Sequence, residues 1–166
     1  MPTHLESFER SSASVGVECI SAKPEKVADA ITDIATGPTV GVSPEHEDVR
    51  LPDTVAVDPT PAELNRVEIG VTPASFAVAD CGSVALLSGD NGSELVSLYV
   101  DHYVAVVDER DIVPNMEAAF DRFDAMSGTG DDDVILATGP SATADMGALV
   151  TGAHGPSKGI VVVVED

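Results

Sequence analysis

The hydrophobic positions of this chain gather in short runs of Val, Ile, Leu and Ala, and these runs predict β-strands. Runs that are nearly continuous and bounded by Gly, Pro, Asp or Asn are typical of strands buried on both faces. The expected strands are Thr39–Val42, Thr54–Val57, Ser75–Ala79, Ser83–Leu87, Tyr103–Val107, Val134–Ala137 and Ile160–Val164. Because only Asp80-Cys81-Gly82 separates the third run from the fourth, we expect these two strands to pair.

Helical patterns stand between several of these runs. The helices are expected at Lys23–Ala35, after Thr60, after Asn115 and at about Ala144–Val150. In the first, Val27, Ile31 and Ile34 share one face. In the second, Thr60, with Pro at the next position and Glu63 after it, forms a capping box. Strands that alternate with helices predict an α/β fold with a mainly parallel sheet covered on both faces.

The length of 166 residues fits one domain with one core, which buries about two thirds of the surface of the unfolded chain. Residues 1–22 mix Ser and acidic residues with short apolar stretches. We expect them to form a loosely ordered N-terminal arm, with one strand around Val15–Ile20. Residues 23–166 are expected to form the single α/β domain.

The charge balance changes the expected environment. Eight Lys and Arg against 29 Asp and Glu give a formal net charge of −21, and repulsion of this size destabilises a compact state unless salt screens it. Disorder does not explain the acidity, because apolar runs such as Ile160–Val164 recur. The charge therefore favours adaptation to a high-salt cytoplasm, such as that of a halophilic archaeon.

The same charge disfavours nucleic acid and anionic membrane surfaces as partners, since binding to phosphates depends on Lys and Arg. No apolar run approaches the ~20 residues that a membrane span needs. Met1–Arg10 lacks the basic and then apolar pattern of a signal peptide. We therefore expect a soluble protein that stays in the cytoplasm.

Neither a metal nor a cofactor is predicted. Cys19 and Cys81 are far apart in sequence, so this chain alone provides neither a CxxC redox pair nor the four thiolates of an iron–sulfur site. Two buried thiols are the simpler interpretation. No pair of His residues has metal-ligand spacing, and Asp131–Asp133 is expected to be a solvated loop. Gly-x-Ser-x-Gly, the nucleophile turn of esterases, is absent.

The segment Thr138–Asp145 is the strongest candidate for a binding site. It follows a predicted strand and opens a helix, which is where open α/β sheets usually bind ligands. Gly139 lets a ligand approach the backbone, Ser141 or Thr143 can cap the helix, and a helix N-terminus favours an anion. Asp145 would repel that anion, and ordinary turn and cap residues remain the alternative interpretation. The segment matches neither a Walker loop nor a dinucleotide-binding fingerprint.

Two histidines are further candidates. His102 precedes the Tyr103–Val107 run, and His154 stands in Gly152-Ala153-His154-Gly155-Pro156. Each has the chemistry of an acid, a base or a ligand near neutral pH, and each is equally compatible with a hydrogen-bonded turn. His4 and His46 fall in segments without a clear pattern and carry no functional signal.

The run from Ala137-Thr138-Gly139-Pro140-Ser141-Ala142-Thr143 to Gly152-Ala153-His154-Gly155-Pro156 resembles the LUD-domain (lactate utilisation) family, LutC/YkgG type. Gly70–Ser83 and Ser97–Val107 are similar to the same family. The resemblance implies a Rossmann-like three-layer sandwich, similar to the NagB/RpiA/CoA-transferase superfamily. It also implies a role in oxidising lactate to pyruvate beside two partners that carry iron–sulfur clusters.

Three positions depart from the family pattern. Ala142 stands where members usually have a basic residue, Asp80-Cys81-Gly82-Ser83 where an acidic residue precedes Thr-Gly-Thr, and Met146-Gly147 where Ile-Glu is usual. The missing cation removes the best charge-assisted donor to a carboxylate or phosphate. A small anionic ligand would then be held by backbone amides and hydroxyls.

Two functions fit these observations. One is an accessory, non-catalytic subunit of an iron–sulfur lactate-oxidising complex. The other is a stand-alone enzyme or small-molecule binder, for a phosphosugar, folate-like or CoA-linked substrate, with Lys158 among its candidate residues. We expect Thr138–Asp145 to meet Asp80–Ser83 and His154, because strand-end loops of a parallel sheet gather at one edge. The predicted ligand-binding residues are Gly139, Ser141, Thr143, Asp145, His154, Asp80, Ser83 and His102.

Overall fold

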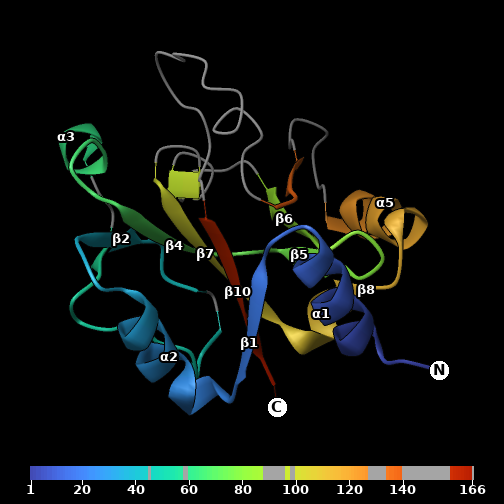
Figure 1. Ribbon diagram of the computed structural model, residues 1–166. Helices are drawn as coiled ribbons and strands as arrows, with labels where there is room; N and C mark the ends of the chain where they lie inside the picture. The colour runs from blue at the N-terminus through green and yellow to red at the C-terminus, as the bar shows by residue number, and fades with distance from the viewer. Residues whose placement is uncertain are drawn as a thin grey trace.

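A six-stranded parallel sheet forms the centre of the computed structural model (Figure 1), which describes residues 1–44, 46–57, 60–87, 96–97, 100–126, 134–139 and 158–165. Every neighbouring pair in this sheet is parallel. In spatial order the strands are β1 (Glu18–Ala22), β10 (Lys158–Val164), β7 (His102–Asp108), β4 (Ile69–Pro73), β2 (Thr39–Gly41) and β3 (Ala56–Val57). The predicted α/β fold with a mainly parallel sheet is therefore confirmed.

A second, four-stranded sheet was not expected. Its spatial order is β8 (Ile112–Val113), β5 (Phe76–Val78), β6 (Ser83–Leu87) and β9 (Val134–Ala137). The predicted pairing of the two strands around Asp80–Gly82 is confirmed as the antiparallel pair β5–β6. β9 pairs with β6, also antiparallel. It therefore does not join the parallel sheet that contains the later strand β10.

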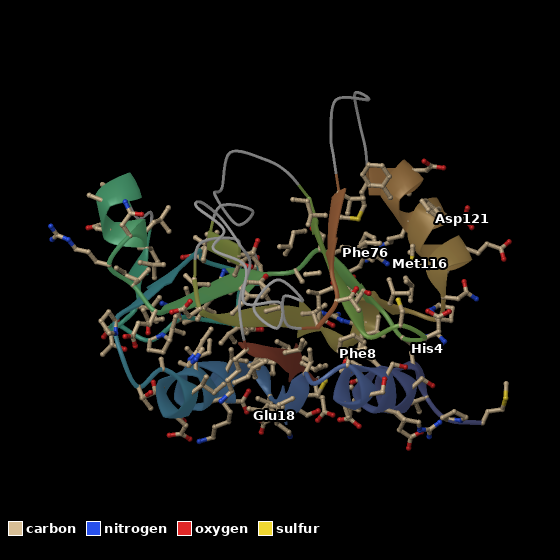
Figure 2. All side chains as sticks on the ribbon, turned by 45° about the horizontal axis from the view of Figure 1, so that its top comes forward. His4, Phe8, Glu18, Phe76, Met116 and Asp121 are labelled. Atoms are coloured by element: carbon tan, nitrogen blue, oxygen red, sulfur yellow. The ribbon has the colours of Figure 1, made fainter. Side chains whose placement is uncertain are left out.

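Three apolar clusters fill the spaces between the layers. Helix α2 (Val27–Ile34), which follows the 3-10 turn Pro24–Lys26, packs on one face of the parallel sheet through Val27 and Ile31. The other face packs against the second sheet. Helix α5 (Met116–Met126) covers the far face of the second sheet, where Phe76 and Met116 belong to one cluster, and Asp121 points outward from this helix (Figure 2).

The first 22 residues correct the expectation of a loosely ordered arm. They form helix α1 (His4–Ser14) and the edge strand β1. The side chain of Phe8 is 0% exposed and lies in the cluster between the two sheets. At the helix start, the Thr3 N–H donates to Glu6 Oε2 at 2.7 Å and the Glu6 N–H donates to Thr3 Oγ1 at 3.1 Å. This capping box stabilises the first turn.

The other predicted helix starts are confirmed where the structure describes them. At α3 (Pro61–Leu64), the Thr60 N–H donates to Glu63 Oε2 at 2.7 Å and the Glu63 N–H donates to Thr60 Oγ1 at 3.3 Å. Asn115 Oδ1 accepts from the Ala118 N–H at 2.9 Å and caps α5. The helix expected at 144–150 lies outside the described residues. None of the described helices is long and apolar enough to cross a membrane.

Candidate functional site

Ser83 and Thr138 meet where the second sheet ends. β6 begins at Ser83 and β9 ends one residue before Thr138, and the antiparallel register pairs Val84 with Ala137. Ser83 is therefore opposite Thr138, and their hydroxyls form a hydrogen bond. The Cys81 thiol lies 3.2 Å from the Ser83 hydroxyl. The start of the candidate segment thus contacts Asp80–Ser83 as expected, whereas its use in binding stays a prediction.

Two glycines bring the end of α1 close to these hydroxyls. Gly82 and Gly139 both have φ of +66°, which side-chain-bearing residues rarely adopt. A Cβ on Gly82 would lie 2.7 Å from the Ser12 nitrogen, and a Cβ on Gly139 would lie 2.8 Å from the Val15 oxygen. Ser11 Oγ donates to the Asp80 carbonyl at 3.2 Å. The Ser83–Thr138 pair is therefore flanked by the junction of α1 and β1.

The two cysteines are free thiols and half-buried, which corrects the expectation that both are buried. Burial raises the pKa of the Cys19 thiol; the Ser12 hydroxyl lowers it, and the carboxylates of Glu9 and Glu18 raise it. A raised pKa keeps the thiol protonated and disfavours it as a nucleophile. The described residues contain no group of three His, Cys, Asp or Glu side chains suited to a metal ion.

His102 and Lys158 occupy a different place. They are paired in register at the amino ends of β7 and β10, and both are exposed. Alternation along the strands puts their side chains on the face that carries Val104 and Ile160, which is the α2 face. The Ser83–Thr138 pair belongs to the second sheet, on the other side. The structure thus divides the described candidate residues into two groups.

Thr138 and Ser83 do meet, but the reason given for expecting it, a shared edge of a parallel sheet, is wrong. β9 belongs to the antiparallel sheet, so its end is not aligned with the ends of the parallel strands. Gly139 instead approaches Val15, which precedes β1, and His102 begins β7. These residues are therefore near the amino ends of parallel strands. Ser141, Thr143, Asp145 and His154 lie outside the described residues.

A charged cluster that the sequence pattern does not reveal lies at the carboxyl end of β7. Asp108 Oδ2 lies 3.5 Å from His46 Nε2 and 2.7 Å from an Arg110 guanidinium nitrogen. The Asp48 N–H donates to His46 Nδ1 at 3.2 Å, while Nε2 is the ring nitrogen that faces Asp108. With both ring nitrogens engaged, His46 links its segment to the end of β7. Nothing in the local sequence links two residues so far apart.

We expect the contribution of Asp108 to stability to disappear in acid. The hydrogen bond from the Arg110 side chain holds the pKa of the Asp108 carboxyl below its usual range; burial opposes this, while the Arg110 N–H and the charges of Arg110 and His46 add to it. A lowered folded pKa contributes stability above the unfolded value of about 3.9, and this contribution is lost as the pH falls through the folded pKa.

Asp108→Asn should therefore lower the free energy of unfolding by about 1.5–3 kcal/mol near neutral pH, the usual range for hydrogen bonds to charged groups. The difference from wild type should shrink as the pH falls below about 4. Urea unfolding at several pH values measures it. Asp29→Asn is the matched control, because Asp29 forms an exposed pair with Lys26 and such pairs contribute little. An Asp108→Asn effect independent of pH would contradict the ionic role.

Comparison with known proteins adds independent evidence. The LUD domain family matches residues 52–164. The Lactate utilization protein C of Halalkalibacterium halodurans is 30% identical over 126 residues, covering 74% of this chain and 55% of that protein. The Lactate utilization protein C of Bacillus licheniformis is 36% identical over 118 residues, covering 69% of this chain and 49% of that protein. The chain thus spans about half the length of these relatives.

A solved structure supports the fold. The crystal structure of a DUF162 family protein from Deinococcus radiodurans is similar with a TM-score of 0.73, at 21% sequence identity. The similarity covers 97% of this chain and 96% of that one, so it includes α1 and β1 as well as the residues matched by the family. Sequence and fold agree, and the chain belongs to the LUD domain family.

Proposed function

We propose that this chain acts in lactate utilisation in the cytoplasm, as an accessory, non-catalytic subunit of an iron–sulfur complex that oxidises L-lactate to pyruvate. The observation that carries the proposal is the match to proteins named Lactate utilization protein C, at 30% and 36% identity over more than two thirds of the chain. Its two cysteines fall short of the four thiolates that a cluster needs. Partner chains would therefore hold the clusters.

Deletion and co-purification in the native host test this proposal. Deleting the gene should abolish or slow growth on L-lactate as carbon source, while growth on pyruvate stays normal. The tagged chain, purified in molar salt, should bring down iron–sulfur proteins. Normal growth of the deletion strain on lactate would remove the metabolic role, and recovery of the chain alone would remove the accessory role.

Adaptation to high salt is part of the same proposal. With a net charge of −21, repulsion is screened as the Debye length falls from ~10 Å at 0.1 M to ~3 Å at 1 M. The melting temperature should therefore rise steadily as potassium chloride increases between these concentrations. Sucrose at equal osmolality is the control, since it does not screen charge. A melting temperature that stays flat with potassium chloride would contradict the adaptation.

One observation favours the alternative of a stand-alone small-molecule binder or enzyme like those of the sugar-phosphate isomerase and CoA-transferase superfamily. Ser83 and Thr138 place two hydrogen-bonding hydroxyls together beside the positive-φ Gly139. Ribose 5-phosphate, folate and coenzyme A in a thermal-shift screen in molar salt test it. A shift with wild type that is lost in Ser83→Ala supports the alternative, and no shift with any ligand removes it.

A further inference from the structure

The amino edge of the parallel sheet sets one lysine beside one histidine. Lys158 begins β10 and is paired with His102, which begins β7 and is paired in turn with Ile69 of β4. The Lys158 N–H donates to the Asp101 carbonyl at 3.2 Å, and the His102 N–H donates to the Glu68 carbonyl at 2.9 Å. Neighbouring strands are about 4.7–4.9 Å apart, so two side chains paired in this way start side by side. Figure 1 shows β10 next to β7.

Both side chains project from the same face. His102 alternates with Val104 and Val106, and Lys158 alternates with Ile160, all of which pack in the cluster beneath α2. His102 and Lys158 themselves are exposed, because they stand where the strands begin. The ammonium and the imidazole can therefore converge on one ligand from adjacent strands.

These two polar side chains make no polar contact with the other residues that the structure describes. Elsewhere in this acidic chain, Lys26, Arg110 and Arg122 each lie against a carboxylate. Within the part of the chain that the structure describes, neither the Lys158 ammonium nor the His102 imidazole has a hydrogen bond or an ion pair. A chain with eight basic residues against 29 acidic ones thus keeps a cation and an N–H donor together without a carboxylate on them.

We propose that Lys158 and His102 bind the carboxylate of a small monocarboxylic acid. A carboxylate offers two oxygens, one for the ammonium and one for an imidazole N–H, which is present in either protonation state of histidine. Asp101 and Glu68 stand one residue before β7 and β4 at the same edge, and both are exposed. Negative charge at this edge repels an anion with two charges more strongly than one with a single charge, so a monoanion should bind better than a dianion. The choice of lactate and pyruvate as probes rests on the proposed function.

The segment Thr138–Asp145 has no basic residue, and Lys158 is a basic residue that follows it in the chain. Ala142 stands where members of the family that this chain resembles usually have a basic residue, and the segment that contains it runs on to Lys158 in sequence. Lys158 supplies a cation at a fixed position in the sheet. A ligand bound there would contact a rigid element, the first residues of two central parallel strands, which favours a defined geometry.

Nuclear magnetic resonance titration of the full chain with sodium L-lactate and sodium pyruvate, in about 1 M potassium chloride, tests the proposal. The imidazole signals of His102, assigned by comparison with His102→Gln, should shift and saturate. Lys158→Gln should weaken binding about tenfold or more, the scale expected when a charge-assisted hydrogen bond is lost. Lys23→Gln is the matched control, since Lys23 is also exposed and its loss changes the net charge equally.

Two further ligands test the chemical class. Lactamide keeps the shape of lactate without the charge and should not saturate the site, and sodium sulfate carries two charges and should bind far more weakly. Equal responses of wild type and Lys158→Gln, or binding of lactamide or sulfate as tight as that of lactate, would overturn the proposal. If iron–sulfur partners co-purify but no monocarboxylate binds, this inference fails and the accessory role stands. If lactate binds but no iron–sulfur partner co-purifies, this inference stands and the accessory role fails.

Discussion

Replacing Phe8 with alanine is expected to lower the free energy of unfolding by about 3–5 kcal/mol, the usual cost of removing a buried phenylalanine. The Phe8 side chain is 0% exposed. It lies in the cluster that joins the two sheets, with Ala77 of β5 and Val161 of β10 among its members. Its removal would leave a cavity where α1 meets both sheets (Figure 2), and would therefore loosen the whole helix.

Phe120→Ala is the matched control, because the same atoms are removed from a side chain that is 63% exposed on α5. Its effect should stay within about 0.5 kcal/mol, as for most surface substitutions. Chemical unfolding in molar salt compares the two variants with wild type. A loss in Phe8→Ala as small as that in Phe120→Ala would show that α1 is not docked on the sheets in solution.

The N-terminal helix α1 is only weakly indicated by the sequence pattern. The Thr3-x-x-Glu6 capping box is visible in the sequence, but it is the only strong local signal for this helix. The apolar stripe that follows is thin, with Leu5 and Phe8 among many polar residues. A helix with so few apolar positions gains most of its stability from tertiary packing, here the burial of Phe8. Local periodicity therefore underestimates it.

Part of the parallel sheet was predictable because strands such as β7 and β10 are nearly continuous apolar runs, which are typical of a sheet covered on both faces. The central strand β4 was not among the expected strands. The second sheet was not predictable. β9 reads as the same kind of apolar run in either sheet, and its partner β6 precedes it by about fifty residues in the chain. β8 spans only Ile112–Val113. Pairing of such strands depends on long-range contacts that alternation of strands and helices does not reveal.

The candidate site was predictable only in part for the same reason. Contact between Ser83 and Thr138 was expected from their positions after strands, and it occurs, but through the antiparallel ladder of β6 and β9. The pairing of His102 with Lys158 depends on the register of two parallel strands, which the sequence does not reveal. The contact of His46 with Asp108 depends on how the segment between β2 and β3 packs beside the end of β7.

Gly82→Ala is expected to lower the free energy of unfolding by about 2–4 kcal/mol. Gly82 has φ of +66°, where a side chain adds about 1 kcal/mol of strain. The added Cβ would also lie 2.7 Å from the Ser12 nitrogen and 2.9 Å from the Ser11 carbonyl carbon. These are backbone atoms of α1 that cannot rotate away, and overpacking of this kind costs about 1–3 kcal/mol more.

Gly159→Ala separates this clash from the general effect of adding a methyl group to a glycine, because its Cβ would meet Val17 Cγ2 at an ordinary 3.6 Å. Unfolding in molar salt should show a clear loss for Gly82→Ala and a small change for Gly159→Ala. If Gly82→Ala acts by displacing α1, its effect must overlap with that of Phe8→Ala, which loosens the same helix. The double variant should then lose less stability than the sum of the two single losses, by an amount outside the few tenths of a kcal/mol expected for independent sites. Strict additivity would show that the strain at Gly82 stays within the β5–β6 turn and does not reach the helix.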